Sequence, residues 1–247
     1  MPVSQHFKSK HYKEWNVYFP QCYPNAYLKL QEMANFLQIT ASEHANLGGV
    51  GFSDLQEYKQ SWVLNRMRIE IDEMPGWLNE IQVNTWVEEL RGAKSTRNFT
   101  IERDGKKLVG VSSLWAIFNT ERRRPDVLAI NTDHIERFPE LHATEKPNDR
   151  IALDIETSER FDYKVQFSDI DIVNHVNNTK YLEWCLNHVD PRIVLENQIK
   201  AIDLNFMREI SLGEDVVIEK STFDQFILFK IVKENNICFA CQFELKS

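Results

Sequence analysis

The segment W-V-L-N-R-M-R-I-E-I at residues 62–71 recurs as A-I-D-L-N-F-M-R-E-I at residues 201–210. Both copies are strand-like. The recurrence indicates a chain built from two related halves, each carrying one such strand. The residues that match at one constant offset are Leu64, Asn65, Met67 and Arg68 in the first copy and Leu204, Asn205, Met207 and Arg208 in the second.

The segments around each copy follow the same order. Each copy is preceded by apolar residues at spacings of three and four, which predict a helix, and is followed by a turn and a further strand-like run. Asp104-Gly105 and residues 234–236 each separate two strand-like runs, which predicts a hairpin in each half. The helical positions are Tyr27, Leu30, Ala34, Leu37 and Ala41 in the first half, and the second pattern begins at Tyr181.

Each half is therefore predicted to contain a strand, a long helix and an antiparallel meander. We predict an α+β protein of two domains, each an antiparallel sheet wrapped around one central helix. Residues 138–159 are rich in Pro, Glu, Asp and Thr with little periodicity, which is typical of a linker. The predicted N-terminal domain spans residues 1–145, the linker residues 146–159, and the C-terminal domain residues 160–247.

A second informative stretch, D-I-D-I-V-N-H-V-N-N-T-K-Y at residues 169–181, leads directly into the second helical pattern. It places two acids, one histidine and three asparagines in a short turn. Capping the first N–H groups of a helix requires only one or two such side chains. A helix N-terminus also offers backbone donors and a positive dipole end, where an oxyanion can be stabilised. The stretch therefore indicates a catalytic loop as well as a cap.

The composition narrows the class of protein. A chain of 247 residues with 43% hydrophobic and 27% charged residues is typical of a soluble globular protein. Its net charge of −8 argues against a general nucleic-acid binder. No apolar run approaches the ~20 residues that span a membrane, and the N-terminus lacks an apolar signal core, so we expect a cytoplasmic protein.

Several kinds of site are not indicated by the sequence. The four cysteines show no framework spacing and are expected to stay reduced. We find no G-x-S-x-G nucleophile motif, no phosphate-binding glycine loop and no metal-ligand spacing. We therefore expect a reaction that uses no cofactor and no metal.

The order of elements resembles the hot-dog fold, duplicated in one chain. F-S-D-I-D-I-V-N-H-V-N-N-T-K-Y-L-E-W at residues 167–184 resembles the signature of the fatty acyl–acyl carrier protein (ACP) thioesterases of plants and bacteria. The first half is similar as well, in E-H-A (43–45), W-V-L-N-R-M-R-I (62–69) and V-N-T-W (83–86). The resemblance runs from about Trp15 to the C-terminus. It implies two tandem hot-dog domains that hydrolyse the thioester of fatty acyl-ACP, release free fatty acid and terminate elongation, with ACP as the partner.

The family motif also implies catalytic positions. Its Asp falls on Asp171, its His on His175 and its Glu on Glu209. The family's Asn usually lies two residues before the His, where this chain has Val173, and Asn174 is the candidate replacement.

A further departure concerns the nucleophile. The Cys that follows the Glu in plant members of the family is Ile210 here, which excludes a thiol nucleophile at that position.

The same residues suit thioester hydrolysis on chemical grounds. The reaction needs an activated water or a carboxylate nucleophile, together with donors for the oxyanion. Asp171 and Glu209 are both candidate bases, with Glu209 on a strand that faces the loop, and His175 can orient water or protonate the leaving thiolate. Asn174 can hold the substrate carbonyl or position a carboxylate. The candidate oxyanion donors are the backbone N–H groups of Val176, Asn177 and Asn178, of which both asparagines are also candidate caps.

The corresponding stretch of the first half, Y-F-P-Q-C-Y-P-N-A-Y at residues 18–27, has neither paired acids nor a histidine. This predicts one active site per chain, with the first domain helping to shape the acyl pocket.

The one basic cluster, Arg122, Arg123 and Arg124, is either a docking site for the acidic carrier or a solvated turn. Two alternatives keep the fold: an acyl-CoA thioesterase, or a non-catalytic sensor of acyl thioesters in which Asp171 and Glu209 are dispensable. A duplicated chain satisfies the two-domain arrangement as a monomer, and a homodimer stays open. The sequence specifies no acyl chain length.

Overall fold

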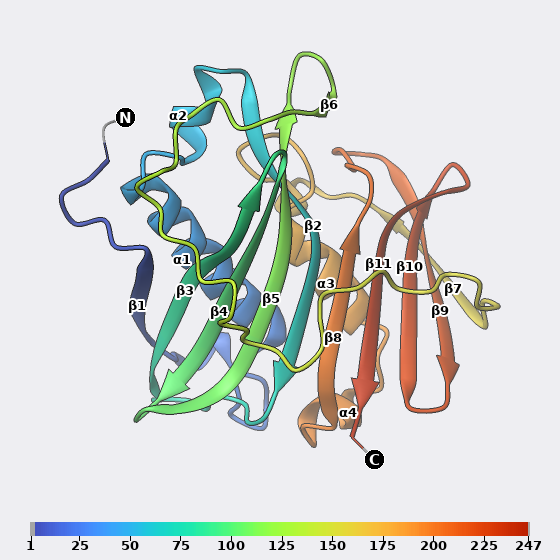
Figure 1. The fold of residues 1–247 in the computed structure, drawn as a ribbon. Helices are drawn as coiled ribbons and strands as arrows, with labels where there is room; N and C mark the ends of the chain where they lie inside the picture. The colour runs from blue at the N-terminus through green and yellow to red at the C-terminus, as the bar shows by residue number, and fades with distance from the viewer. Residues whose placement is uncertain (1–2, 247) are drawn as a thin grey trace.

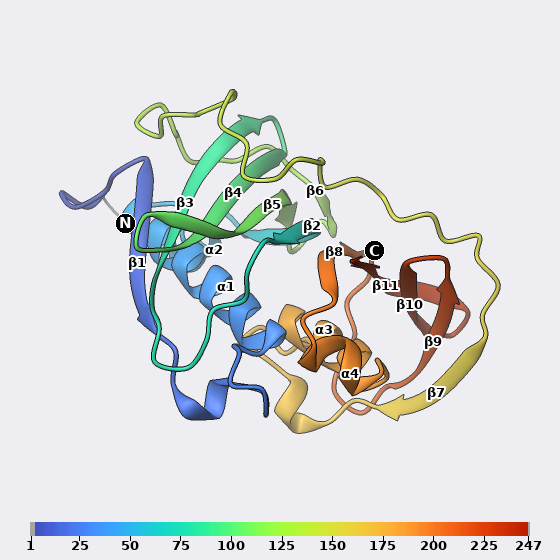
Figure 2. The ribbon, with the colours of Figure 1, turned by 90° about the horizontal axis from the view of Figure 1, so that it is seen from below.

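The computed structural model describes residues 3–246, which form one continuous antiparallel sheet of eleven strands. The sheet curves around two helices, α1 (Leu30–Leu47) and α3 (Asn178–Leu186), which lie on its concave side (Figure 1 and Figure 2). The strands of the first half are β1 (Lys10–Asn16), β2 (Gln60–Ile71), β3 (Glu80–Arg91), β4 (Lys94–Arg103), β5 (Lys106–Asn119) and β6 (Arg124–Pro125). Those of the second half are β7 (Glu159–Lys164), β8 (Ile199–Phe206), β9 (Asp215–Phe223), β10 (Phe226–Lys233) and β11 (Asn236–Leu245).

The two halves repeat one strand order. It runs β1-β3-β4-β5-β2 in the first half and β7-β9-β10-β11-β8 in the second. The strands that carry the sequence repeat, β2 and β8, pair with each other at the junction, where Met67 lies opposite Leu204. The prediction of two tandem hot-dog units, each a sheet around one helix, is confirmed. The joining of both units into one sheet follows from the β2–β8 pairing, which periodicity within either half does not reveal.

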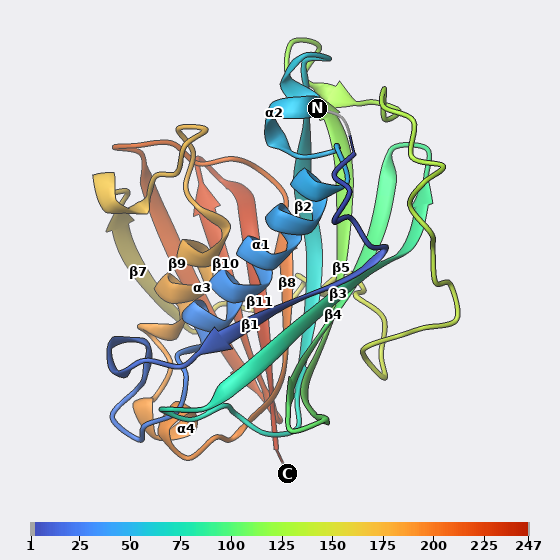
Figure 3. The same ribbon diagram turned by 90° about the vertical axis from the view of Figure 1, so that its left-hand side faces the viewer.

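Both helices pack into one core shared by the two halves. The buried face of α1 includes Leu30, Ala34, Leu37 and Ala41, as its apolar spacing predicted. Helix α1 contacts α3, and Leu182 of α3 belongs to the same hydrophobic cluster. Figure 3 shows the two helices side by side in the space that the sheet encloses. Shorter helical segments are α2 (Phe52–Gln56), α4 (Pro191–Leu195) and the 3-10 turns η1 (Phe19–Gln21) and η2 (Phe167–Asp169).

The predicted hairpins form where the turn residues accept a left-handed backbone. Asp104 and Gly105 have φ of 53° and 77°, the paired positive values that a two-residue turn between twisted strands requires. Glu234 and Asn235 have φ of 48° and 63°. Because Asn236 already pairs with Lys233, the second turn is one residue shorter than expected.

The segment between β6 and β7 crosses the convex face of the sheet as a strap (Figure 1). Outward-facing polar side chains hold it, since Asn98 Oδ1 accepts from Ala143 N at 3.1 Å and Asn205 Oδ1 accepts from Ile151 N at 3.0 Å. At Gly110 a Cβ atom would lie 2.0 Å from Ala143 O, so only glycine permits this approach. The predicted domain limits stay a prediction, because both halves share one sheet and one core.

Candidate active site

The loop that joins η2 to α3 is a tight turn fixed by its own backbone. Asp171 N donates to His175 O at 2.9 Å, and Asn174 N donates to Asp171 O at 3.0 Å. Asn174 has φ of 63°, a left-handed conformation that Asn adopts more readily than most residues. The turn therefore places Asp171 and His175 opposite each other at its base.

Glu209 is the residue that the structure brings to His175. His175 Nε2 lies 3.6 Å from Glu209 Oε2, and the two side chains are 34% and 39% exposed. The two loops that carry them are joined because Val176 N donates to Ile210 O at 2.9 Å. The geometry thus forms a water-accessible imidazole–carboxylate pair.

The expectation that Glu209 lies on a strand is wrong. Strand β8 ends at Phe206, and Glu209 lies in the loop that follows. Met207 N and Arg208 N both donate to Cys238 O, at 2.9 and 3.0 Å. Two successive donors on one carbonyl end the regular ladder, in which each residue has its own partner. The chain then turns toward the loop before α3.

Asp171 flanks this pair without joining it. Its Oδ1 accepts from Val173 N at 3.0 Å, and among residues 3–246 it makes no ion pair. Asn174 is exposed, and its side chain has no hydrogen-bond partner within the described chain. The geometry gives Asn174 a turn-forming role, and its catalytic role stays a prediction.

The start of α3 offers fewer oxyanion donors than the sequence suggested. Val176 N already donates to Ile210 O, and Asn177 N donates to Asp169 O at 2.8 Å. The N–H group of Asn178 has no acceptor among the described residues, as expected for the first residue of a helix. The expectation of three free donors is therefore corrected to one.

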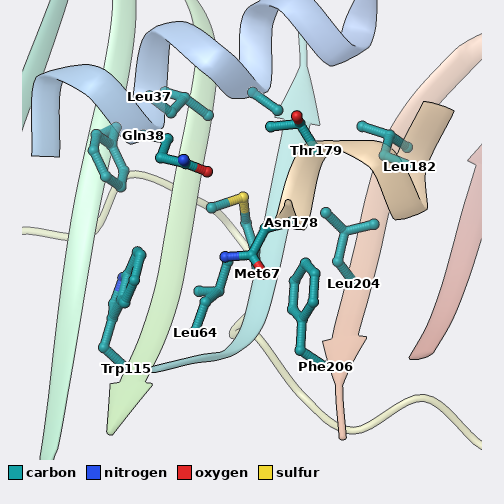
Figure 4. Close-up of a pocket in the computed structure, with 12 residues that line it drawn as sticks. Leu37, Gln38, Leu64, Met67, Trp115, Asn178, Thr179, Leu182, Leu204 and Phe206 are labelled. Atoms are coloured by element: carbon teal, nitrogen blue, oxygen red, sulfur yellow. The ribbon is translucent and has the colours of Figure 1, made fainter. Parts of the chain in front are cut away.

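The two asparagines at the helix start have different positions. Asn177 is the N-cap, and its Oδ1 accepts from Thr179 N at 3.0 Å. Asn178 is not a cap. Its side chain lines a pocket between the two halves of the protein, where Figure 4 shows it among apolar side chains.

This pocket is formed by both helices and by strands of both halves. Its space is about 390 Å³, a value that includes the part open to solvent. Gln38 and Asn178 supply amide groups, and Trp115 closes one side (Figure 4). The remaining lining residues are Ala34, Leu37, Leu64, Met67, Phe99, Thr179, Leu182, Leu204 and Phe206. Its lining is therefore mostly apolar, and Asn178 and Thr179 at the start of α3 form part of it.

Tyr181 is a buried residue near the site and was missed by sequence reasoning, which used it only to mark the start of a helix. It is 4% exposed. Burial raises the pKa of Tyr181, and the nearby Cys238 and the carboxylates of Glu209 and Asp171 raise it further, while a hydrogen bond with the Ile210 backbone opposes this. Its phenol is therefore neutral and lies within electrostatic reach of both carboxylates.

Glu214 closes the loop that carries Glu209. Its Oε2 accepts from Ser211 N at 2.9 Å and from Lys233 Nζ at 2.9 Å. Burial acts to raise the pKa of Glu214, but the hydrogen bonds from Ser211 and Lys233 outweigh it, so the pKa is lowered. The carboxylate is thus charged at neutral pH and fastens the loop to β10.

The three arginines of the basic cluster do not act together. Arg123 Nη2 donates to Glu209 Oε2 at 3.1 Å. Arg122 and Arg124 are exposed and make no ion pair within residues 3–246. The predicted docking cluster is thus divided, because one of its members reaches the candidate active site.

Residues 3–246 contain neither a candidate metal site nor a helix suited to cross a membrane. No group of three or more His, Cys, Asp and Glu side chains is placed to hold a metal ion. None of the helices in this range combines the length and apolar character needed to cross a membrane.

The chain was compared with known proteins. Residues 8–137 match the model of the acyl-ACP thioesterase N-terminal domain, and residues 153–247 match that of the C-terminal domain. A chloroplastic palmitoyl-ACP thioesterase of Arabidopsis thaliana is 30% identical over 210 residues, covering 78% of this chain and 50% of the relative. One from Cuphea hookeriana is 29% identical, covering 78% of this chain and 49% of the relative. The chain spans about half the length of these curated relatives.

Solved structures show the same fold. An acyl-ACP thioesterase from Bacteroides thetaiotaomicron superposes with a TM-score of 0.87 at 24% identity, covering 96% of this chain and 98% of the other. The 12:0-ACP thioesterase from Umbellularia californica gives 0.84 at 17% identity, with 97% and 98% covered. With family models matching both halves and a relative at 30% identity, the chain belongs to the acyl-ACP thioesterase family.

Proposed function

We propose that this protein hydrolyses the thioester of fatty acyl-ACP, releasing free fatty acid and terminating chain elongation. The observation that carries the proposal is the His175–Glu209 pair, which lies just before the helix start where Asn178 lines the apolar pocket. The pair offers acid–base chemistry and the pocket offers a place for an acyl chain. Membership of the family supports the same reaction.

The geometry supports a mechanism with a water nucleophile. The acyl chain lies in the pocket, which places the thioester carbonyl near the free N–H group of Asn178 and the positive end of the α3 dipole. Glu209 takes a proton from water while His175 orients that water, and the water oxygen attacks the carbonyl carbon. The C–S bond then breaks, and the departing thiolate takes up the proton that Glu209 had accepted from water, which restores the carboxylate. Asp171 stays an alternative base, because it lies at the opposite side of the same turn.

The first half contributes to the substrate site in this proposal. Helix α1 and strands β2, β4 and β5 supply part of the pocket lining, including Leu37, Phe99 and Trp115. The N-terminal half therefore shapes the acyl pocket, while the C-terminal half carries the acids and the imidazole.

The proposed partner is the acyl carrier protein. Arg122 and Arg124 are exposed on the turn beside the candidate active site and offer positive charge on a chain whose net charge is −8. A local positive patch favours encounter with an acidic carrier, and salt should weaken the effect.

The test is turnover of matched acyl-ACP and acyl-CoA thioesters of graded length, with released thiol measured. We expect hydrolysis of acyl-ACP, and we expect Glu209→Gln to lower turnover about 10²–10⁴-fold, the usual scale for loss of a general base. Asp171→Asn should cost less, since Asp171 does not pair with His175. If the wild type binds the thioesters without releasing thiol, the protein is a non-catalytic sensor of acyl thioesters. If it hydrolyses acyl-CoA faster than acyl-ACP, it is an acyl-CoA thioesterase.

A further inference from the structure

We propose that Arg123 is a positioning residue, which reaches from the N-terminal half to hold the Glu209 carboxylate beside His175. This inference rests on the proposed function. It adds that the site is complete only when both halves of the chain contribute a residue. It also replaces the idea that Arg123 serves the carrier alone.

The first support is the way in which one carboxylate oxygen is shared. Glu209 Oε2 lies 3.1 Å from Arg123 Nη2 and 3.6 Å from His175 Nε2. The guanidinium of Arg123 and the imidazole of His175 thus approach the same carboxylate oxygen. Glu209 Oε1 has no hydrogen-bond partner among residues 3–246. Arg123 thus sets which oxygen faces the imidazole and which is left for water.

The second support is the construction of the turn that presents Arg123. Asn119 is buried at the end of β5, and its Oδ1 accepts from Glu121 N at 3.2 Å and from Arg122 N at 2.8 Å. Asn119 Nδ2 donates to Asp126 Oδ2 at 3.1 Å across the turn. A turn held at both ends can deliver a side chain to a fixed place.

The third support is the backbone of Arg123 itself. Its φ of 53° is left-handed, a conformation in which glycine carries no steric cost. Its guanidinium also lies over the Phe118 ring, 5.7 Å from the centroid, which restricts the side chain. The Arg123 side chain is 66% exposed, so its ion pair with Glu209 contributes little to the stability of the fold. A long charged side chain at this position is therefore better explained by what it does to Glu209 than by folding.

The experiment compares Arg123→Gln, Arg123→Lys and Arg123→Gly on two substrates, a short acyl-CoA and an acyl-ACP of the same chain. We expect kcat to fall about 10- to 100-fold on both substrates, the scale of a misplaced catalytic group. Arg123→Lys should recover part of the loss, because it restores the charge without the planar fork. Arg91→Gln, which removes an exposed arginine on β3 that makes no ion pair within residues 3–246, is the control and should match the wild type.

Two further measurements separate positioning from other roles. In the background of Glu209→Gln, adding Arg123→Gln should cause no further loss, since the group it positions is already gone. Arg123→Gly should keep the wild-type melting temperature while it loses turnover, because glycine suits the left-handed backbone.

The outcomes are distinct. A loss confined to KM for acyl-ACP, with kcat on acyl-CoA unchanged, would make Arg123 a docking residue and overturn the inference. So would wild-type kcat in Arg123→Gln, or a full additive loss in the double variant. A wild-type protein that releases no thiol from either substrate would instead overturn the proposed function.

Discussion

The loop before α1 and the loop before α3 share a backbone and differ in their side chains. In the first loop Tyr23 N donates to Tyr27 O at 2.8 Å, and in the second Asp171 N donates to His175 O at 2.9 Å. The fourth residue of each five-residue loop also has a positive φ, 64° at Ala26 and 63° at Asn174. The bonds to the following strand–strand connection match as well, from Leu28 N to Pro75 O at 2.8 Å and from Val176 N to Ile210 O at 2.9 Å.

This correspondence pairs each proposed catalytic residue with a counterpart in the first half. Tyr23 stands where the second loop has Asp171, Tyr27 where it has His175, and Met74 where it has Glu209. The hydrogen-bonded frame is thus independent of the chemistry that it carries. The duplicated fold supplies two frames, and the side chains place an imidazole–carboxylate pair at only one of the two.

The most direct test of this difference gives the second loop the side chains of the first. We expect His175→Tyr with Glu209→Met to lower turnover about 10²–10⁴-fold or more, because both members of the acid–base pair are lost. The melting temperature should change little, since the backbone bonds persist. Tyr27→His in the first loop is the matched control and should keep wild-type turnover, because Met74 provides no carboxylate there. A collapse of the fold in the double variant would show that the frame depends on these side chains.

A second comparison concerns the histidines near the C-terminal ends of the helices. Burial, and then the Arg97 guanidinium, lower the pKa of His44 in α1 to about 3, whereas His188 after α3 is less buried and its pKa is lowered by burial and by Lys220. His44 Nδ1 accepts from Arg97 Nη1 at 2.8 Å, which requires the neutral ring.

The sign of the pH effect follows from this shift. The unfolded chain binds a proton at the ordinary histidine pKa of 6.5 and the folded chain only near 3, so stability is full above pH 6.5 and falls as the pH drops toward 3. Between pH 7 and 5 this one residue should cost about 2 kcal/mol of unfolding free energy. Urea unfolding of wild type and His44→Gln at both pH values measures it. An equal acid-induced loss in both proteins would exclude His44 as the source.

The smallest expected effect concerns the helix starts. Helix α3 has a side-chain cap in Asn177, whereas α1 begins after Lys29, which provides none. We expect Asn177→Ala to destabilise the protein by about 1 kcal/mol and Lys29→Asn to stabilise it by a similar or smaller amount. Thermal and urea unfolding of the two variants test this. A loss of stability in Lys29→Asn would show that the Lys29 contact with Pro20 O matters more than a cap.

The local features of this protein could be predicted from the order of its residues. Apolar spacing of three and four placed α1, and Asp104-Gly105 placed a hairpin, because side-chain periodicity and turn conformation are properties of neighbouring residues. The repeat around Asn65 and Asn205 gave the duplication, and the polar stretch before α3 gave the loop with Asp171 and His175.

The way in which distant segments meet became clear from the folded structure. The pairing of β2 with β8 joins two halves into one sheet, and the early end of β8 places Glu209 in a loop against His175. The folded structure also brings Arg123 to Glu209 and places Asn178 in the lining of the pocket. It engages the N–H groups of Val176 and Asn177 in backbone hydrogen bonds. Each of these facts depends on strand register and on contacts between residues far apart in the chain. No local pattern encodes them, because a one-residue change of register alters which side chains meet while leaving every periodicity intact.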